Sequence, residues 1–254
     1  MGTTLEVEVV GQEVLLAYRS LVAVEGRLGE SLARRGQRVG SSIADQWLIL
    51  HDFLQLYARG LAPAGVVVLG GAPDAGSRHT GIPFTGPREA RELLGLRASG
   101  TGVSPSAAAF WDAVAGARAA RNDAPLESLF GTVHLAHAIP FDAAFTPDVE
   151  NASIAHVLTL LERARPQAIA AVGREAIHVL SRALESDALA ELAEAPESAW
   201  AERWAHGGLS ACPWADVPAG RPFRVRVMPL GAIDGPYAAT TRDALERLFT
   251  YALS

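Results

Sequence analysis

The residues best suited to chemistry lie in one glycine-rich loop, residues 70–86. It reads Gly-Gly-Ala-Pro-Asp-Ala-Gly-Ser-Arg-His-Thr-Gly-Ile-Pro-Phe-Thr-Gly. Glycines and a proline in a tight turn direct backbone N–H groups into a cleft, where they bind an anion or a carbonyl oxygen. The spacing matches neither a P-loop nor a dinucleotide-binding fingerprint. The sequence therefore predicts a ligand-binding turn that is not a phosphate loop.

Four side chains of this loop have both a chemical and a structural interpretation. Asp74 can form a turn before Ala75-Gly76, or its carboxylate can approach a reacting sugar or a water. Phe84 can plug the core, or it can offer a face on which a planar ligand stacks. Arg78 and His79 can meet a phosphate, or they can remain solvated at the surface.

Further polar residues follow two later strands. His137 lies in the strand expected over 132–139, where it either packs or donates a hydrogen bond to a ligand carbonyl. Asp234 and Tyr237 follow the last expected strand. Asp234-Gly235 is a good turn signal, and Tyr237 serves either as a wedge or as a loop anchor. Because ligands bind beyond the carboxyl ends of strands in open parallel sheets, we expect these residues to meet the 70–86 loop.

Apolar runs and helical spacing predict the elements that position these residues. Strands are expected at 65–70, 132–139, 168–172 and 223–228, and helices at 12–35, 42–59, 87–94, 104–120, 151–163, 174–184, 188–204 and 240–253. Segment 205–222 is expected to be a loop. Alternating strands and helices predict an α/β fold with three α/β/α layers and a central, mainly parallel, four-stranded sheet. We expect a single domain over 1–254, with 1–60 as its N-terminal helical part.

Composition restricts the chemistry further. The chain has 254 residues, one cysteine and a net charge of −6, and all its basic residues are arginines. One cysteine excludes an internal disulfide, a four-cysteine zinc site and an iron–sulfur cluster, and we expect no metal and no cofactor. We expect a cytoplasmic monomer without membrane contact. The net acidity counts against nucleic acid, unless a group of arginines gathers on the pocket face: Arg78, Arg88, Arg91, Arg224 and Arg226.

Several motifs, in order, resemble the uracil-DNA glycosylase superfamily, most closely its single-strand-selective monofunctional branch. Leu-Gly-Gly-Ala-Pro at 69–73 and Thr-Gly-Ile-Pro-Phe at 80–84 resemble the first motif of that branch, Gly-Met-Asn-Pro and then Thr-Gly-Val-Pro-Phe. Phe110-Trp111, the segment 134–141 and the turn 165–174 resemble later segments of that branch. The resemblance covers roughly residues 60–254. It implies an α/β fold, a flipped-out base in a pocket, and DNA as the partner, single-stranded DNA included.

The resemblance implies roles for individual residues. The residues expected to bind the substrate are Gly71, Ala72, Pro73, Phe84 and His79. Those expected to contact DNA are Arg78, Asp234 and Tyr237.

The catalytic motifs of that superfamily are degenerate in this chain. Ala72 stands where most members hold the attacking water with Asn or Asp, and His137 stands where the base is read by Asn. The second motif, His-Pro-Ser, should fall near 229–232, where no histidine occurs. Two nearby polar residues, His137 and Asp74, are the expected catalytic substitutes.

These features predict a monofunctional DNA glycosylase that removes uracil or another deaminated base with nonstandard catalytic residues. Because the chain has no lysine, such an enzyme would leave an intact abasic site. A protonated His137 would stabilise the departing base. Since the unperturbed pKa of histidine is about 6.5, activity would rise as pH falls through that value. Two alternatives stay open: an inactive relative that binds nucleic acid or a free base, and a scaffold for other proteins.

Overall fold

The computed structural model describes residues 3–58, 65–101, 104–218, 220 and 222–254. Its helices are α1 (Thr3–Arg34), α2 (Ile43–Ala58), α3 (Pro87–Glu92), α4 (Pro105–Ala119), α5 (Leu126–Phe130), α6 (Pro147–Ala164), α7 (Arg174–Ala183), α8 (Asp187–Glu194), α9 (Glu197–Gly207) and α10 (Ala238–Ala252). Short 3₁₀ turns occupy Ser77–His79 and Gly208–Ala211. The strands are β1 (Val66–Gly70), β2 (Val133–His137), β3 (Ala168–Val172), β4 (Trp214–Val217) and β5 (Phe223–Leu230).

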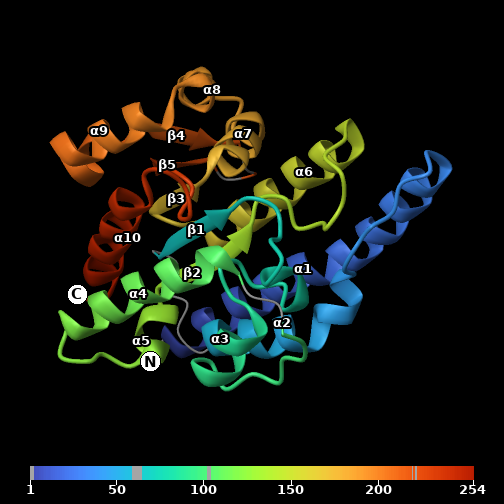
Figure 1. The fold of residues 1–254 in the computed structure, drawn as a ribbon, viewed down its shortest axis with the longest axis horizontal. Coiled ribbons are helices and arrows are strands. Elements are labelled where there is room, and N and C mark those ends of the chain that lie inside the picture. Colours follow the sequence, from blue (N-terminus) through green and yellow to red (C-terminus); the bar gives the residue numbers. More distant parts are fainter. Residues whose placement is uncertain (1–2, 59–64, 102–103, 219, 221) are drawn as a thin grey trace.

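The central sheet has the order β2-β1-β3-β5-β4 (Figure 1). The first four of these strands run parallel, and β4 pairs antiparallel with β5. All residues of β1, β2 and β3 are buried, as expected for strands covered on both faces. The α/β class and the mainly parallel sheet predicted from the sequence are confirmed. The count of four strands is wrong, because the sheet has a fifth, β4.

Strand β4 lies inside the segment that the sequence marks as a loop, 205–222. It has only four residues, it alternates between exposed and buried positions, and Pro213 and Pro218 flank it. An edge strand this short carries almost no periodic signal, which explains the wrong prediction. β4 pairs only with Phe223–Arg226 of β5. Pro229 lies further along β5, where β5 has no neighbouring strand on the side of β4. Its missing N–H therefore costs no hydrogen bond of the sheet.

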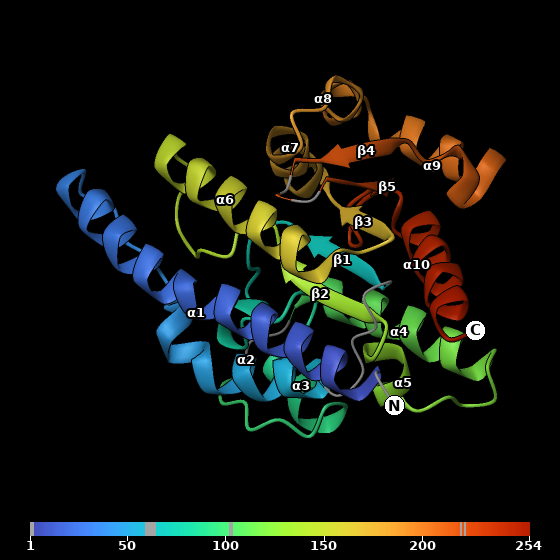
Figure 2. The ribbon, with the colours of Figure 1, turned by 180° about the vertical axis from the view of Figure 1, so that it is seen from behind.

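Helices cover both faces of the sheet. α1 packs against α2 and α6, and α4 packs against α10. Figures 1 and 2 place α1 and α6 on one side of the sheet, with α4 and α10 on the other. No helix within the described residues is long and apolar enough to cross a membrane.

The helical predictions needed three corrections. α1 begins at Thr3 rather than near residue 12, the expected helix 188–204 is divided into α8 and α9 around Pro196, and the short α5 was not predicted. The start of α2 is fixed by a buried carboxylate of α1. Glu25 accepts hydrogen bonds from Ile43 N–H and from Ser42 Oγ–H, both at 2.9 Å. This contact satisfies a helix-terminal N–H that has no intrahelical partner.

Candidate functional site

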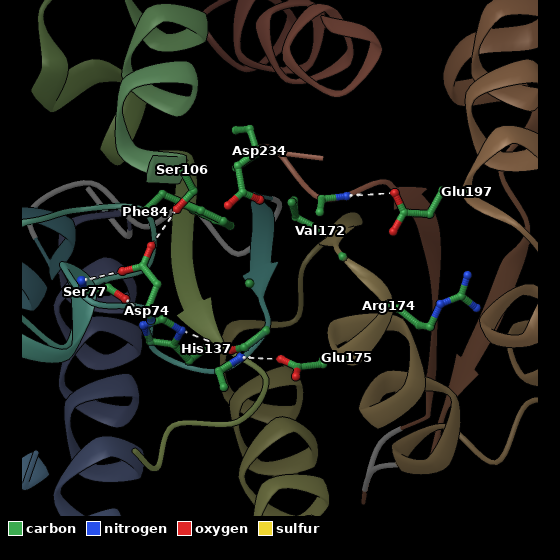
Figure 3. A pocket seen from close by; sticks show the side chains of 16 residues that line it. Asp74, Ser77, Phe84, Ser106, His137, Val172, Arg174, Glu175, Glu197 and Asp234 are labelled. Carbon is green, nitrogen blue, oxygen red and sulfur yellow. Dashed lines mark hydrogen bonds between the residues drawn. The ribbon is translucent and has the colours of Figure 1, made fainter. Parts of the chain in front are cut away.

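A cavity of about 350 Å³ lies beyond the carboxyl ends of the central strands (Figure 3). Most of its lining comes from three segments: the loop after β1, the turn from β3 into α7, and the loop after β5. The end of β2 and the starts of α4 and α9 supply the rest. Its lining includes the predicted residues Gly71, Ala72, Asp74, Phe84, His137 and Asp234. The structure therefore brings together side chains from three regions that are far apart in the sequence. Their chemical roles stay predictions.

Asp74 carries a carboxylate whose acceptor positions are filled. Its Oδ1 accepts from Ser77 N–H at 2.7 Å and from Gly76 N–H at 3.0 Å, and its Oδ2 accepts from Ser106 Oγ–H at 2.7 Å and from the Ser104 hydroxyl. Burial alone would raise the pKa of Asp74, but these hydrogen bonds outweigh it, so the pKa lies below its usual value. Asp74 is therefore a fixed negative charge at the cavity wall.

Phe84 is at once part of the core and part of the cavity wall. Its ring is 8% exposed and stacks on Phe110, with ring centroids 4.9 Å apart and planes 17° from parallel. Its φ angle is +55°, a left-handed conformation that costs a non-glycine residue on the order of 1 kcal/mol or more. Trp111 Nε1–H holds the loop in this shape through a 3.1 Å hydrogen bond to the Phe84 carbonyl. The two interpretations of Phe84 are thus compatible.

His137, at the end of β2, does not have the acid–base properties expected of it. Burial lowers its pKa to about 4, although the hydrogen bond to Gly71 and the charge of Asp74 act in the opposite direction. The ring is therefore neutral at pH 7. Its Nδ1 lies 3.1 Å from the Gly71 carbonyl, and since a carbonyl only accepts, Nδ1 carries the proton. Nε2 then has only a lone pair, so the prediction of a protonated donor near pH 6.5 is wrong.

Two glutamates that sequence reasoning missed take part in the site. Glu175, in the first turn of α7, accepts from Ala72 N–H at 3.0 Å. Glu197, in the first turn of α9, accepts from Ala232 N–H at 3.3 Å. Without a ligand, the Ala72 N–H is therefore engaged by Glu175, and its contact with a base stays a prediction. Acidic residues in first helical turns are common, so their sequence positions gave no sign of these contacts.

Four predicted contact residues do not line the cavity: Pro73, Arg78, His79 and Tyr237. Arg78 is directed to the carboxylate of Asp142, at 3.9 Å, and its Nε donates to the Asp74 carbonyl at 3.3 Å. His79 is exposed at the end of a 3₁₀ turn, and Tyr237 is half-buried just before α10.

The five arginines whose grouping would favour nucleic acid do not gather at the cavity. Arg88 pairs with Glu89 at 2.7 Å, and Arg91 donates to the Ala98 carbonyl at 3.0 Å. Arg224 and Arg226 lie over the ring of Trp214 at the β4–β5 edge. The basic face that DNA binding usually requires is therefore not built from these residues.

The cavity is instead lined by acidic side chains. Among the described residues that line it, four are carboxylates, Asp74, Glu175, Glu197 and Asp234, and one is a cation, Arg174. In the part of the chain that the structure describes, there is no group of three or more histidine, cysteine, aspartate or glutamate side chains arranged to hold a metal ion.

No family model matches the chain, and no curated protein matches it. Among solved structures, the chain is similar to a crystal structure of wild-type SMUG2 from Pedobacter heparinus. The sequence identity is 12%, the TM-score is 0.47, and the match covers 80% of this chain and 81% of that chain. We therefore infer function from the residues of the pocket.

Proposed function

We propose that the pocket binds a planar heterocyclic base and hydrolyses the N-glycosidic bond between that base and a sugar. One observation carries the proposal: an aromatic ring, Phe84, and a fixed carboxylate, Asp74, line the same cavity of about 350 Å³. Stacking on an aromatic side chain is the usual way to hold an unpaired base, and it is worth about 1–3 kcal/mol. The uracil or deaminated base in DNA that the sequence resemblance implies is one candidate substrate.

Asp74 suits the sugar side of this reaction. When the N-glycosidic bond breaks, the base takes the bonding electron pair and the sugar becomes cation-like, after which water adds to it. A nearby carboxylate that stays ionised stabilises that cation. Since hydrogen-bond donors already occupy its acceptor positions, Asp74 acts through its charge and not as a general base.

The base side of the reaction needs a rearrangement. A departing base is stabilised by donors, yet the Ala72 N–H is engaged by Glu175 and the His137 Nδ1–H by the Gly71 carbonyl. For cleavage, an acceptor atom of the base must therefore replace the Glu175 carboxylate at Ala72. These engaged donors favour a second candidate function, in which the pocket binds a base without cleaving the bond.

A base-release assay separates the two functions. The protein is incubated with oligonucleotides containing uracil, hypoxanthine or xanthine and with the common nucleosides, and free base is measured by chromatography. Hydrolysis predicts release of at least one base, slowed by Asp74→Asn by about tenfold to a thousandfold. The exposed control Asp112→Asn should match the wild type. Binding of a base or nucleoside without release from any substrate would favour the second function, and neither binding nor release would contradict both.

A further inference from the structure

The negative charge around the cavity would repel a phosphate group. Among the lining residues that the structure describes, Arg174 is the one cation, and its guanidinium is already engaged. It donates to the Ala195 carbonyl at 3.1 Å and to the Ala193 carbonyl, and it lies 5.4 Å from the ring centroid of Trp200. Figure 3 shows it on the far side of the cavity from Asp74. An entering phosphate would meet four carboxylates without a cation free to bind it.

Three side-chain donors of the cavity are also engaged. Ser106 donates to Asp74, Arg174 donates to two carbonyls, and His137 Nδ1–H donates to the Gly71 carbonyl. A ligand carbonyl beside Ser106, Arg174 or His137 would have to displace one of these contacts to find a side-chain donor.

The open side-chain groups are acceptors. Glu175 and Glu197 each use Oε2 for a loop N–H, and within the described ranges Oε1 of neither has a hydrogen-bond partner. Asp234 is exposed at the cavity. Such groups accept from N–H donors and repel carbonyl oxygens.

We infer that the pocket selects a nucleoside whose base carries an exocyclic amino group, and that it discriminates against a substrate bearing a phosphate. This inference rests on the proposed base-binding function and narrows its substrate class. It also differs from the uracil substrate that the sequence resemblance implies, because uracil carries a carbonyl where cytosine carries an amino group.

Calorimetric titration with three matched ligands tests the inference. Adenosine and inosine differ at C6, where an amino group is replaced with a carbonyl, and at the adjacent N1, which gains a proton; adenosine and AMP differ by one phosphate. We expect adenosine to bind at least about tenfold more tightly than inosine, as for a hydrogen bond to a charged acceptor, and at least about tenfold more tightly than AMP. The AMP discrimination should shrink as salt is raised, since salt screens exposed charges.

The variant Glu175→Gln tests whether a cavity carboxylate causes the discrimination against AMP. The amide keeps an oxygen that accepts from Ala72 N–H, but it removes the negative charge. It should reduce the preference for adenosine over AMP by about threefold to tenfold. Glu191→Gln removes the same charge from an exposed site on α8 outside the cavity and should leave the preference unchanged. Equal effects of both variants would contradict the inference.

The binding results distinguish a wrong inference from a wrong proposed function. If no base or nucleoside binds, the proposed function is wrong. If adenosine, inosine and AMP bind with similar affinity, the pocket binds bases but the selection by amino group and phosphate is wrong. Tighter binding of inosine or AMP than of adenosine would overturn the inference in the same way.

Discussion

Asp74 supplies the negative charge that the glycine-rich loop places at the cavity wall. The turn places two backbone N–H groups on one carboxylate oxygen, while hydroxyls near the start of α4 bind the other. The same contacts that keep Asp74 ionised also connect the loop to α4. The charge at the cavity wall and the stability of the loop therefore both depend on the side chain of Asp74.

Asp74→Asn should lower the free energy of unfolding by about 1–3 kcal/mol, because the amide NH₂ would face groups that now donate. Chemical denaturation of the variant and of exposed Asp112→Asn measures this directly. An Asp74→Asn protein as stable as the control would show that the hydrogen bonds around Asp74 do not stabilise the loop.

Residue-scale features differ in how well the sequence predicts them. Asp74, Phe84 and His137 were found because each lies in or next to a segment with a glycine, proline or strand signal. The contacts of Glu175 and Glu197 span 103 and 35 residues, and only the assembled sheet brings their partners near. The low pKa of His137 comes from complete burial, which local sequence does not encode.

At the scale of elements, the pocket depends on helix starts. α7 and α9 each contribute a first-turn glutamate that holds a loop at a strand end. The sequence predicted most helices because their apolar spacing is regular, and it missed β4 because an edge strand of four residues is too short to show a period. Elements were thus predictable where they bury a continuous face.

The start of α2 gives a test at this scale. Glu25→Ala should lower the free energy of unfolding by about 1–3 kcal/mol, since Ile43 N–H loses its buried acceptor. Ligand affinity should not change, because Glu25 does not line the cavity. Glu30→Ala, at an exposed position of α1, is the control for helix propensity. A loss no larger than that of the control would contradict a capping role.

For the molecule as a whole, a group of buried histidines joins β2 to α1 and α6. His134 and His137 of β2 and His156 of α6 are buried, and Tyr18 of α1 packs edge-on against His134 and His156, with centroids 6.1 and 5.5 Å away. Burial lowers the pKa to about 4 for His134 and His137 and to about 3 for His156. The folded protein therefore holds all three neutral at pH 7.

Stability should fall steeply in mild acid. Between the unfolded pKa of about 6.5 and the lower folded values, the unfolded chain binds more protons, so unfolding becomes easier as pH decreases. The slope should reach about 1.4 kcal/mol per pH unit for each histidine. Denaturation between pH 7 and 4 measures it. His156→Gln should reduce the slope by the contribution of one histidine, whereas His206→Gln, at an exposed position, should leave the slope unchanged. A stability that stays constant over this range would contradict the neutral buried histidines.

The most direct test of the central claim is a calorimetric titration of adenosine into wild-type, Phe84→Leu and Phe145→Leu proteins. Phe145 is 51% exposed and lies outside the cavity, so its variant controls for the loss of an aromatic ring. We predict one site in the wild type and in Phe145→Leu, and at least about tenfold weaker binding in Phe84→Leu, from the loss of stacking. Thermal unfolding of each variant verifies that it is folded. Undiminished binding by folded Phe84→Leu, or no binding by the wild type, would contradict a base stacked on Phe84.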